Sequence, residues 1–453
     1  MIKKLCCFLL IFSMTLTPVA FADEPTSDDT QQTVSSSDTK KSVTLPEIKS
    51  ETAVVMDADS GQFLYQKKKD EQKAPASITK LMTALLVFQK GANLDDEITV
   101  NASALEGTSG TTTCDLAEGE KVTVKDMLYA MLLSSANDAA NVLAEYVSGT
   151  QDQFVKKMNT TAKGLGCVNT NFVNPNGLDD DEQLTTAADM ARIARALFDY
   201  DDFLTIIGTQ SYTMNGTNKH EEDRTFDSKI SFLFETSQYY DKDVIGAKTG
   251  WTSTANHTLV TFAQRDDRKL VVVNMDCSSK YQKFQDVIDA LDYSFDAFKG
   301  VTISASDLYN AAVKALKDDK DAQPDKNSFH DITVYLAPAN SADSLSYTFT
   351  TGSSPTGTIV FTGSNGSSQD LVTFDYSLNK VQTSGADDTG KKKTSPFKII
   401  LRIVIIVFIA WLVFYGFLIY SNRERARRKR RRERERRIRE REQNQNRQDR
   451  NRY

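Results

Sequence analysis

Ser77 and Lys80 form a Ser-x-x-Lys pair at the start of an amphipathic stretch, a spacing that could support nucleophilic catalysis. Positions i and i+3 of a helix share a face, so the lysine amine would lie beside the serine hydroxyl. A serine is a weak nucleophile until an adjacent base accepts its proton. Lysine can act as that base only if burial and another cation lower its pKa. The pair therefore predicts acyl transfer through Ser77, whose backbone N–H at the helix start would also stabilise a developing oxyanion.

Two further motifs, Ser135-Ala136-Asn137 and Lys248-Thr249-Gly250, follow in the chain. Ser-x-x-Lys alone is a weak signal, because residues 37–40 and 377–380 also match it. Those matches fall in a polar linker and in the last strands before a polar stalk, whereas Ser77 opens a helix inside a well-patterned domain. Lys-Thr-Gly occurs once, and Lys248 could supply the cation that lowers the pKa of Lys80. Together the motifs favour an active site over a helix cap with an exposed lysine.

Hydrophobic periodicity predicts the elements that position these motifs. Residues 51–66 indicate a β-hairpin that turns at 59–61, and helices are expected over 77–89, 124–133, 139–147, 186–198 and 284–298. Strands are expected over 244–249, 258–262 and 270–274, and a structural turn over 174–177. From residue 301 the chain is rich in Thr, Ser, Gly and β-branched residues, which predicts a small β-rich domain.

The residues around the motifs extend the pattern to a known family. They are Ala76-Ser77-Ile78-Thr79-Lys80-Leu81-Met82-Thr83, Ser135-Ala136-Asn137-Asp138-Ala139-Ala140, Phe172-Val173-Asn174-Pro175-Asn176-Gly177-Leu178 and Gly246-Ala247-Lys248-Thr249-Gly250-Trp251-Thr252. This set resembles the low-molecular-mass penicillin-binding proteins, which are serine-type D-alanyl-D-alanine carboxypeptidases. The resemblance implies an α/β fold, with a penicillin-binding/β-lactamase-like domain of mainly antiparallel sheet flanked by helices, followed by a β-rich domain.

The resemblance also implies roles for the motif residues. Ser77 would be acylated by the penultimate D-alanine carbonyl of a peptidoglycan stem peptide, with release of the terminal D-alanine, and water would then hydrolyse the ester. Lys80 would be the base, Ser135 a proton relay and Asn137 a hydrogen-bond partner of the substrate amide. β-Lactam antibiotics would acylate the same serine, and the resemblance implies neither a cofactor nor a metal.

The Lys-Thr-Gly segment would recognise the end of the substrate. By the same resemblance, Lys248 and Thr249, with Gly250 beside them, would bind the free terminal carboxylate. The backbone N–H groups of Ser77 and Trp251 would form the oxyanion hole.

Three rival functions share these motifs. A β-lactamase would have to hydrolyse its acyl-enzyme quickly, and a permanent membrane anchor with a second domain counts against it. A D,D-endopeptidase passes through the same intermediate, so the motifs do not separate it from a carboxypeptidase. A catalytically silent wall-binding protein would not need Ser77, Lys80, Ser135 and Lys248 together.

The two ends of the chain predict export and anchoring. Residues 1–22 combine two lysines, an apolar run and Ala20-Phe21-Ala22, which is typical of a secretory signal peptide. Residues 403–420 are 18 consecutive apolar and aromatic residues, a helix of roughly 27 Å that nearly crosses a bilayer core. Residues 423–453 hold 16 Lys or Arg against 6 Asp or Glu, so the positive-inside rule places this tail in the cytoplasm and the catalytic domain outside.

The expected order of segments follows from these features. It is a signal peptide (1–22), a linker (23–46), a catalytic domain (47–300), a β-rich domain (301–382), a stalk (383–398), a transmembrane helix (399–420) and a basic cytoplasmic tail (421–453).

Charge and composition exclude some partners. The whole chain carries a net charge of −6, and the +10 tail leaves −16 for the rest, which argues against nucleic acid as a partner. Once the signal is removed, Cys114, Cys167 and Cys277 remain, an odd number with no C-x-x-C spacing, which indicates separate buried thiols and no metal site. The histidines at 220, 257 and 330 lack the Ser and Asp pattern of a triad.

Overall fold

The computed structural model describes residues 44–379 except 320–321, 338–339 and 365. Within these ranges no helix is long and apolar enough to cross a membrane. The predicted signal peptide, the stalk, the transmembrane helix, the basic tail and most of the linker lie outside the described residues.

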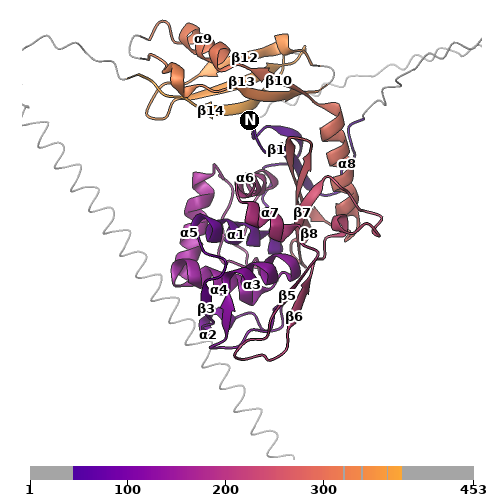
Figure 1. The fold of residues 1–453 in the computed structure, drawn as a ribbon. Helices are drawn as coiled ribbons and strands as arrows, with labels where there is room; N and C mark the ends of the chain where they lie inside the picture. Colours follow the sequence, from indigo (N-terminus) through magenta and orange to yellow (C-terminus); the bar gives the residue numbers. More distant parts are fainter. Residues whose placement is uncertain (1–43, 320–321, 338–339, 365, 380–453) are drawn as a thin grey trace, which may run out of the picture. The chain divides into compact units, whose positions relative to one another are not determined.

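A five-stranded antiparallel sheet forms the centre of the catalytic region (Figure 1). Its order is β2-β1-β9-β8-β7, with β1 at Thr52–Asp57, β2 at Phe63–Lys67, β7 at Val244–Thr252, β8 at Asn256–Arg265 and β9 at Arg268–Cys277. The predicted hairpin and the three predicted strands are all present, and the strands run several residues beyond the predicted ends. β7 pairs only with β8 among the described strands, so its outer edge is left free beside the helices.

Both faces of this sheet are covered, because successive side chains of a strand point to opposite faces. Val54 and Met56 of β1 pack into the core under the helices, whereas Ala53 and Val55 pack into the core under α8 (Gln282–Ala297). In Figure 1, α8 accordingly lies on the opposite side of the sheet from α1 (Lys80–Gln89) and α6 (Ala187–Leu197).

The helical side carries the remaining elements of the catalytic region. Its further helices are α2 (Ala102–Leu105), α3 (Val124–Tyr129), α4 (Asn137–Ser148), α5 (Gln151–Gly164) and α7 (Asp201–Ile207). Two small two-stranded antiparallel sheets accompany them, β3 (Glu97–Thr99) with β4 (Lys121–Thr123) and β5 (Ser211–Met214) with β6 (Arg224–Asp227). Side-chain caps stabilise the N-termini of several helices. Thr123 and Asp126 form a capping box on α3, and Thr186 caps α6.

Two predicted helices differ in detail from the structure. The helix expected over 77–89 begins as a 3₁₀ turn, Ala76–Thr79, and becomes α-helical only at Lys80. The helix expected over 124–133 is α-helical only to Tyr129 and widens into a π-turn, Ala130–Ser134. Such turns are local departures from α geometry that often occur at functional sites, and hydrophobic periodicity does not report them.

The region after residue 298 is rich in strands, with one helix that the sequence analysis missed. Strands β10 (Lys299–Ile303) and β11 (Ile332–Leu336) pair, and β12 (Leu345–Phe349), β13 (Thr356–Thr362) and β14 (Ser368–Asp375) form a second sheet. The missed helix is α9, Ala305–Ala315, which Ser304 caps and which buries Leu308 and Ala312 one turn apart. Two buried positions are too few to stand out from the Ser- and Thr-rich surroundings.

Candidate active site

Ser77 sits in the 3₁₀ turn that leads into α1, partly exposed between two buried neighbours, Ala76 and Ile78. Residues i and i+3 of a 3₁₀ helix eclipse each other. The amine of Lys80 therefore lies directly over the serine, with Nζ 2.9 Å from Ser77 Oγ. The pairing predicted from the Ser-x-x-Lys spacing is present in the structure.

Lys80 is 0% exposed, and its amine contacts three oxygens. Besides Ser77 Oγ, these are Asn137 Oδ1 at 2.6 Å and the backbone oxygen of Asn176 at 2.5 Å. Burial lowers the pKa of Lys80 well below its ordinary value, and the positive charge of Lys248 lowers it further, against a smaller opposing effect of Asp138. A neutral amine has two N–H donors and one lone pair. It can thus donate to the two carbonyl oxygens and accept the hydroxyl proton of Ser77.

The π-turn brings the second motif to this amine. Ser135, directly after the turn, has a left-handed backbone with φ 68°, a conformation that costs a non-glycine residue about 1 kcal/mol or more. Asn137 then begins α4, and its side-chain amide is fixed at both ends, because Oδ1 accepts from Lys80 and Nδ2 donates to Thr111 Oγ1 at 3.0 Å.

Lys248 of the Lys-Thr-Gly motif contacts Ser135 of the Ser-Ala-Asn motif. It lies on the edge strand β7, is 1% exposed, and donates to Ser135 Oγ at 3.0 Å and to the backbone oxygen of Thr249 at 3.0 Å. Burial, together with the positive charges of Lys229 and Lys283, lowers the pKa of Lys248 to about 7. Although it lies on an edge strand, Lys248 is therefore a buried cation and not part of an exposed strand end.

Gly250 and Trp251 complete this strand. A Cβ on Gly250 would lie 2.4 Å from Thr258 Oγ1 and 2.8 Å from the backbone nitrogen of Ser77, so β7 can pass the serine this closely only with glycine there. Trp251 follows at the strand end and is 61% exposed.

The sequence analysis missed the contribution of Asn176. The predicted turn is present, with Asn174 Oδ1 accepting from the Gly177 backbone nitrogen at 2.7 Å. It is more than a structural turn, because it aims the carbonyl of Asn176 at Lys80. Gly177 has φ +85°, and a Cβ there would lie 2.0 Å from the backbone oxygen of Ala76. The Asn-Pro-Asn-Gly turn signal could have located the loop, but a backbone acceptor has no residue signature of its own.

The structure therefore brings the three motifs into two hydrogen-bonded groups, Ser77-Lys80-Asn137 and Ser135-Lys248, joined by the short segment from 135 to 137.

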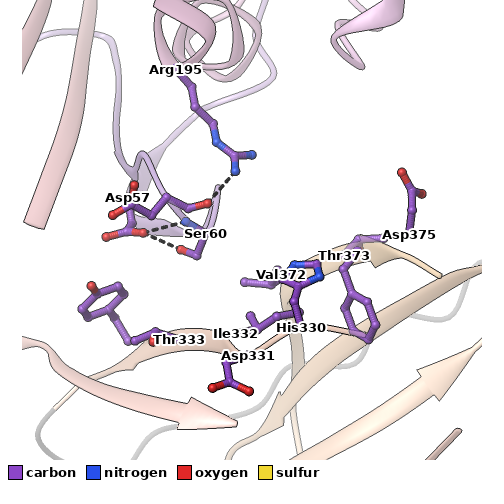
Figure 2. Close-up of a pocket in the computed structure, with 13 residues that line it drawn as sticks. Asp57, Ser60, Arg195, His330, Asp331, Ile332, Thr333, Val372, Thr373 and Asp375 are labelled. Atoms are coloured by element: carbon purple, nitrogen blue, oxygen red, sulfur yellow. Dashed lines mark hydrogen bonds between the residues drawn. The ribbon is translucent and has the colours of Figure 1, made fainter. Parts of the chain in front are cut away.

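A separate cavity of about 530 Å³ lies between the turn after β1 and the strands β11 and β14 (Figure 2). Asp57, Ser60 and Arg195 lie on one side of it, and Asp331, Thr333 and Asp375 lie on the other. None of the motif residues lines that cavity, so it is not the site of the predicted chemistry.

The thiols do not offer a second nucleophile. Cys114, Cys167 and Cys277 are free and buried, which confirms the prediction of separate buried thiols. Cys114 lies near the second motif, with Sγ 3.5 Å from Asp138 Oδ1, and burial next to that carboxylate raises the pKa of its thiol well above the ordinary value. In the part of the chain that the structure describes, no group of three or more His, Cys, Asp or Glu could hold a metal ion.

The fold and these three motifs define an enzyme of the penicillin-recognising serine class, in which a serine paired with a buried lysine performs acyl transfer. The D-alanyl-D-alanine carboxypeptidase family, peptidase family S11, matches residues 39–279, which is more than half of the chain. The chain belongs to this family, and the predicted α/β fold, serine hydrolase chemistry and D-alanyl-D-alanine carboxypeptidase function are confirmed.

Individual relatives and a solved structure are consistent with membership of this family. The chain is 32% identical to the D-alanyl-D-alanine carboxypeptidase DacF of Bacillus subtilis over 324 residues, 70% of this chain and 77% of the relative. It is 31% identical to DacC of Escherichia coli, over 65% of this chain and 68% of the relative. The crystal structure of the Streptomyces K15 DD-transpeptidase matches with 29% identity and a TM-score of 0.52, over 56% of this chain and 99% of that one.

Proposed function

We propose that this enzyme removes the terminal D-alanine from peptidoglycan stem pentapeptides on the outer side of a cell membrane, through an acyl-enzyme on Ser77. The observation that carries the proposal is the contact of 2.9 Å between Ser77 Oγ and the amine of Lys80, which is 0% exposed. Family membership supports the reaction class, and the geometry supports the assignment of roles to individual residues.

In the first half-reaction Lys80 Nζ accepts the proton of the Ser77 hydroxyl as Oγ attacks the penultimate D-alanine carbonyl. The negative charge on the carbonyl oxygen is met by the backbone N–H groups of Ser77 and Trp251. The C–N bond to the terminal D-alanine then breaks, and its amine leaves with the proton that Lys80 took from Ser77, which Ser135 relays.

In the second half-reaction a water molecule attacks the Ser77 ester and gives its proton to Lys80. The ester C–O bond breaks, and Lys80 returns the proton to Ser77 Oγ. Asn137 is suited to hold the substrate amide, because Lys80 and Thr111 orient its side chain. Lys248 and Thr249 would receive the terminal carboxylate along β7, which Gly250 allows to pass close to the Ser77 turn.

β-Lactam antibiotics would react at the same site. The carbonyl of their strained amide would lie at Ser77, and the separate carboxylate of the drug would lie at Lys248.

We propose the membrane tether from the sequence: the apolar run 403–420 and the basic tail support a single membrane-spanning helix, a cytoplasmic tail and an external catalytic domain. The tether would keep the enzyme at a high effective concentration near nascent stem peptides.

The test of the proposed function is release of D-alanine from a synthetic stem pentapeptide, compared between the wild type and Ser77→Ala. The wild type should release one D-alanine per peptide, and the variant should fold and release essentially none. D-Alanine release that survives in Ser77→Ala would reject the assignment of the nucleophile.

A further inference from the structure

Asp138, the residue after Asn137, is a buried carboxylate that accepts hydrogen bonds from backbone N–H groups. It lies in the first turn of α4 and is 1% exposed. Its two oxygens share the backbone nitrogen of Cys114 at 3.0 and 3.1 Å. Oδ1 also accepts from the backbone nitrogen of Ala139 at 2.9 Å, and Oδ2 from that of Leu116 at 3.2 Å. A buried carboxylate is costly unless hydrogen bonds meet its charge, so these contacts stabilise it at the start of the helix.

The contacts of Asp138 tie a loop to α4. Cys114 and Leu116 belong to the segment 108–116 between α2 and β4, which we call the threonine loop because residues 108, 111, 112 and 113 are threonines. The backbone oxygen of Cys114 accepts from Nη1 of Arg224 on β6 at 2.9 Å. The loop is therefore held through its N–H groups by α4 and through a carbonyl group by β6.

The threonine loop in turn holds Asn137 at two points. The backbone nitrogen of Asn137 donates to the backbone oxygen of Thr112 at 2.8 Å, and its Nδ2 donates to Thr111 Oγ1 at 3.0 Å. The Thr111 hydroxyl donates to the backbone oxygen of Thr108 at 2.6 Å, so its oxygen is turned to accept from Asn137. Asn137 Oδ1 accepts from Lys80 at 2.6 Å. The direction of the Asn137 amide is therefore set by the threonine loop at one end and by Lys80 at the other.

We propose that Asp138 is a positioning residue for acyl transfer: it fixes the threonine loop to the start of α4, and the loop holds the Asn137 side chain in place beside Lys80. This inference rests on the proposed function, in which Lys80 is the base and Asn137 holds the substrate amide. Asp138 touches neither the substrate nor the reacting atoms, and it acts through the loop. Without the loop, the Asn137 side chain would be free to turn between rotamers.

The charge of Asp138 has a second consequence. Lys80 must be neutral to accept the Ser77 proton, so the acidic limb of the pH profile of kcat/KM follows the pKa of Lys80. The charge of Lys248 lowers that pKa and the charge of Asp138 raises it. Removing the Asp138 charge should therefore lower the pKa of Lys80 further and move the acidic limb to lower pH. The other titratable and charged groups around Asp138 and the threonine loop, which stay unchanged in this comparison, are Cys114, Glu120 and Arg224.

The experiment compares Asp138→Asn with Asp189→Asn in the full-length enzyme. Asp189 is the matched control, because it is also 1% exposed and lies in the first turn of a helix, α6. Its carboxylate likewise binds a loop, through the backbone nitrogen of Asn169 at 2.9 Å and Thr170 Oγ1 at 2.8 Å, and it contacts none of the motif residues in the described structure.

Both variants should unfold at a lower temperature than the wild type, because each loses an acceptor for buried donors. Only Asp138→Asn should lower kcat/KM for a D-alanyl-D-alanine peptide, by about 10- to 100-fold, since a small misplacement of a positioning group is costly in rate. Only Asp138→Asn should also move the acidic limb to lower pH. The measurement is D-alanine release across the pH range, at a temperature where circular dichroism shows each variant folded.

Thr111→Val tests the path through Asn137, and it keeps the test decisive if Asp138→Asn folds poorly. Valine has the shape of threonine and cannot accept from Asn137 Nδ2, so kcat/KM should fall about tenfold with the acidic limb unmoved. Thr113→Val, on the same loop, should resemble the wild type, because Thr113 Oγ1 donates to the exposed side chain of Asp115. The double variant of Asp138→Asn and Thr111→Val should lose little more than the slower single variant, because both act on one side chain.

Four outcomes would reject the proposal for Asp138. They are wild-type kcat/KM in folded Asp138→Asn or in Thr111→Val, an equal loss in Asp189→Asn, losses that multiply in the double variant, and an acidic limb that does not move in Asp138→Asn. Failure of the proposed function is distinct from all of them, because the wild type itself would then release no D-alanine at any pH.

Discussion

A Cβ on Gly250 would lie 2.8 Å from the backbone nitrogen of Ser77, so the edge strand β7 passes the nucleophile's backbone too closely for a residue with a side chain. This contact fixes the distance between the Lys-Thr-Gly strand and the serine. In the proposed mechanism the Ser77 N–H is one of the two oxyanion donors, so a change in this packing should affect catalysis.

Gly250→Ala should therefore damage catalysis more than folding. The methyl group must displace either β7 or the 3₁₀ turn, and loss of one oxyanion donor costs about 100-fold or more in kcat. The measurement is D-alanine release, with thermal unfolding alongside. Gly164→Ala is the matched control, because nothing lies within 4 Å of its Cβ position. An active Gly250→Ala enzyme would show that the Ser77 N–H is not used in the oxyanion hole.

Lys80→Met should remove the base while keeping the volume of the side chain. Turnover should fall by several orders of magnitude, because no other described amine hydrogen-bonds to Ser77 Oγ. The backbone oxygen of Asn176 and the side chain of Asn137 lose a donor, so a moderate loss of stability is expected as well. Single-turnover acylation and circular dichroism separate the two effects. Near wild-type acylation in a folded variant would rule out Lys80 as the base.

The pH profile of kcat/KM should be bell-shaped. Lys80 must be neutral to accept the proton, so the rate rises as the pH passes its lowered pKa. Lys248 must be charged to attract the carboxylate, so the rate falls as the pH rises through about 7. A bound carboxylate raises the pKa of Lys248, so kcat should fall at higher pH than kcat/KM.

Lys248→Arg tests the alkaline limb, because arginine keeps its charge at all working pH values. The fall near pH 7 should disappear in this variant. Lys248→Gln should lose much more activity on a D-alanyl-D-alanine peptide with a free C-terminus than on the same peptide amidated at its C-terminus. Equal losses on the two peptides would mean that Lys248 serves the proton transfers around Ser77 instead of carboxylate recognition.

Topology can be tested without reference to catalysis. Protease added to intact wall-stripped cells should digest the catalytic domain and spare a tag placed after Tyr453, because the basic tail is expected inside. A chain ending at residue 381 should be released in soluble form and still cleave free peptide. A tail that is digested from outside would overturn the predicted orientation.

Much of the site could be predicted from the sequence, because its side chains stand at fixed spacings on strongly patterned elements. Ser77 and Lys80 are three residues apart, and both α- and 3₁₀-helical geometry bring them together. Lys248 was expected to influence Lys80 because two cations in one dry site repel each other. The central sheet could be predicted because β8 and β9 contain runs of β-branched residues, which are buried on both faces of the sheet.

Other parts depend on tertiary packing that leaves no pattern in the sequence. The π-turn before Ser135 and the left-handed backbone of that residue are set by neighbouring elements. The acceptor from Asn176 is a main-chain atom, which every residue type supplies. Lys283 appears in the sequence as an ordinary charged residue of an amphipathic helix, and only its burial in the structure distinguishes it.

The most direct test of the central claim is the mass of peptides from the full-length enzyme after reaction with benzylpenicillin. A stable adduct should form on the peptide that contains Ser77, should persist for minutes or longer, and should be absent from Ser77→Ala. An adduct on any other residue, or no adduct at all, would contradict an acyl-enzyme mechanism centred on Ser77.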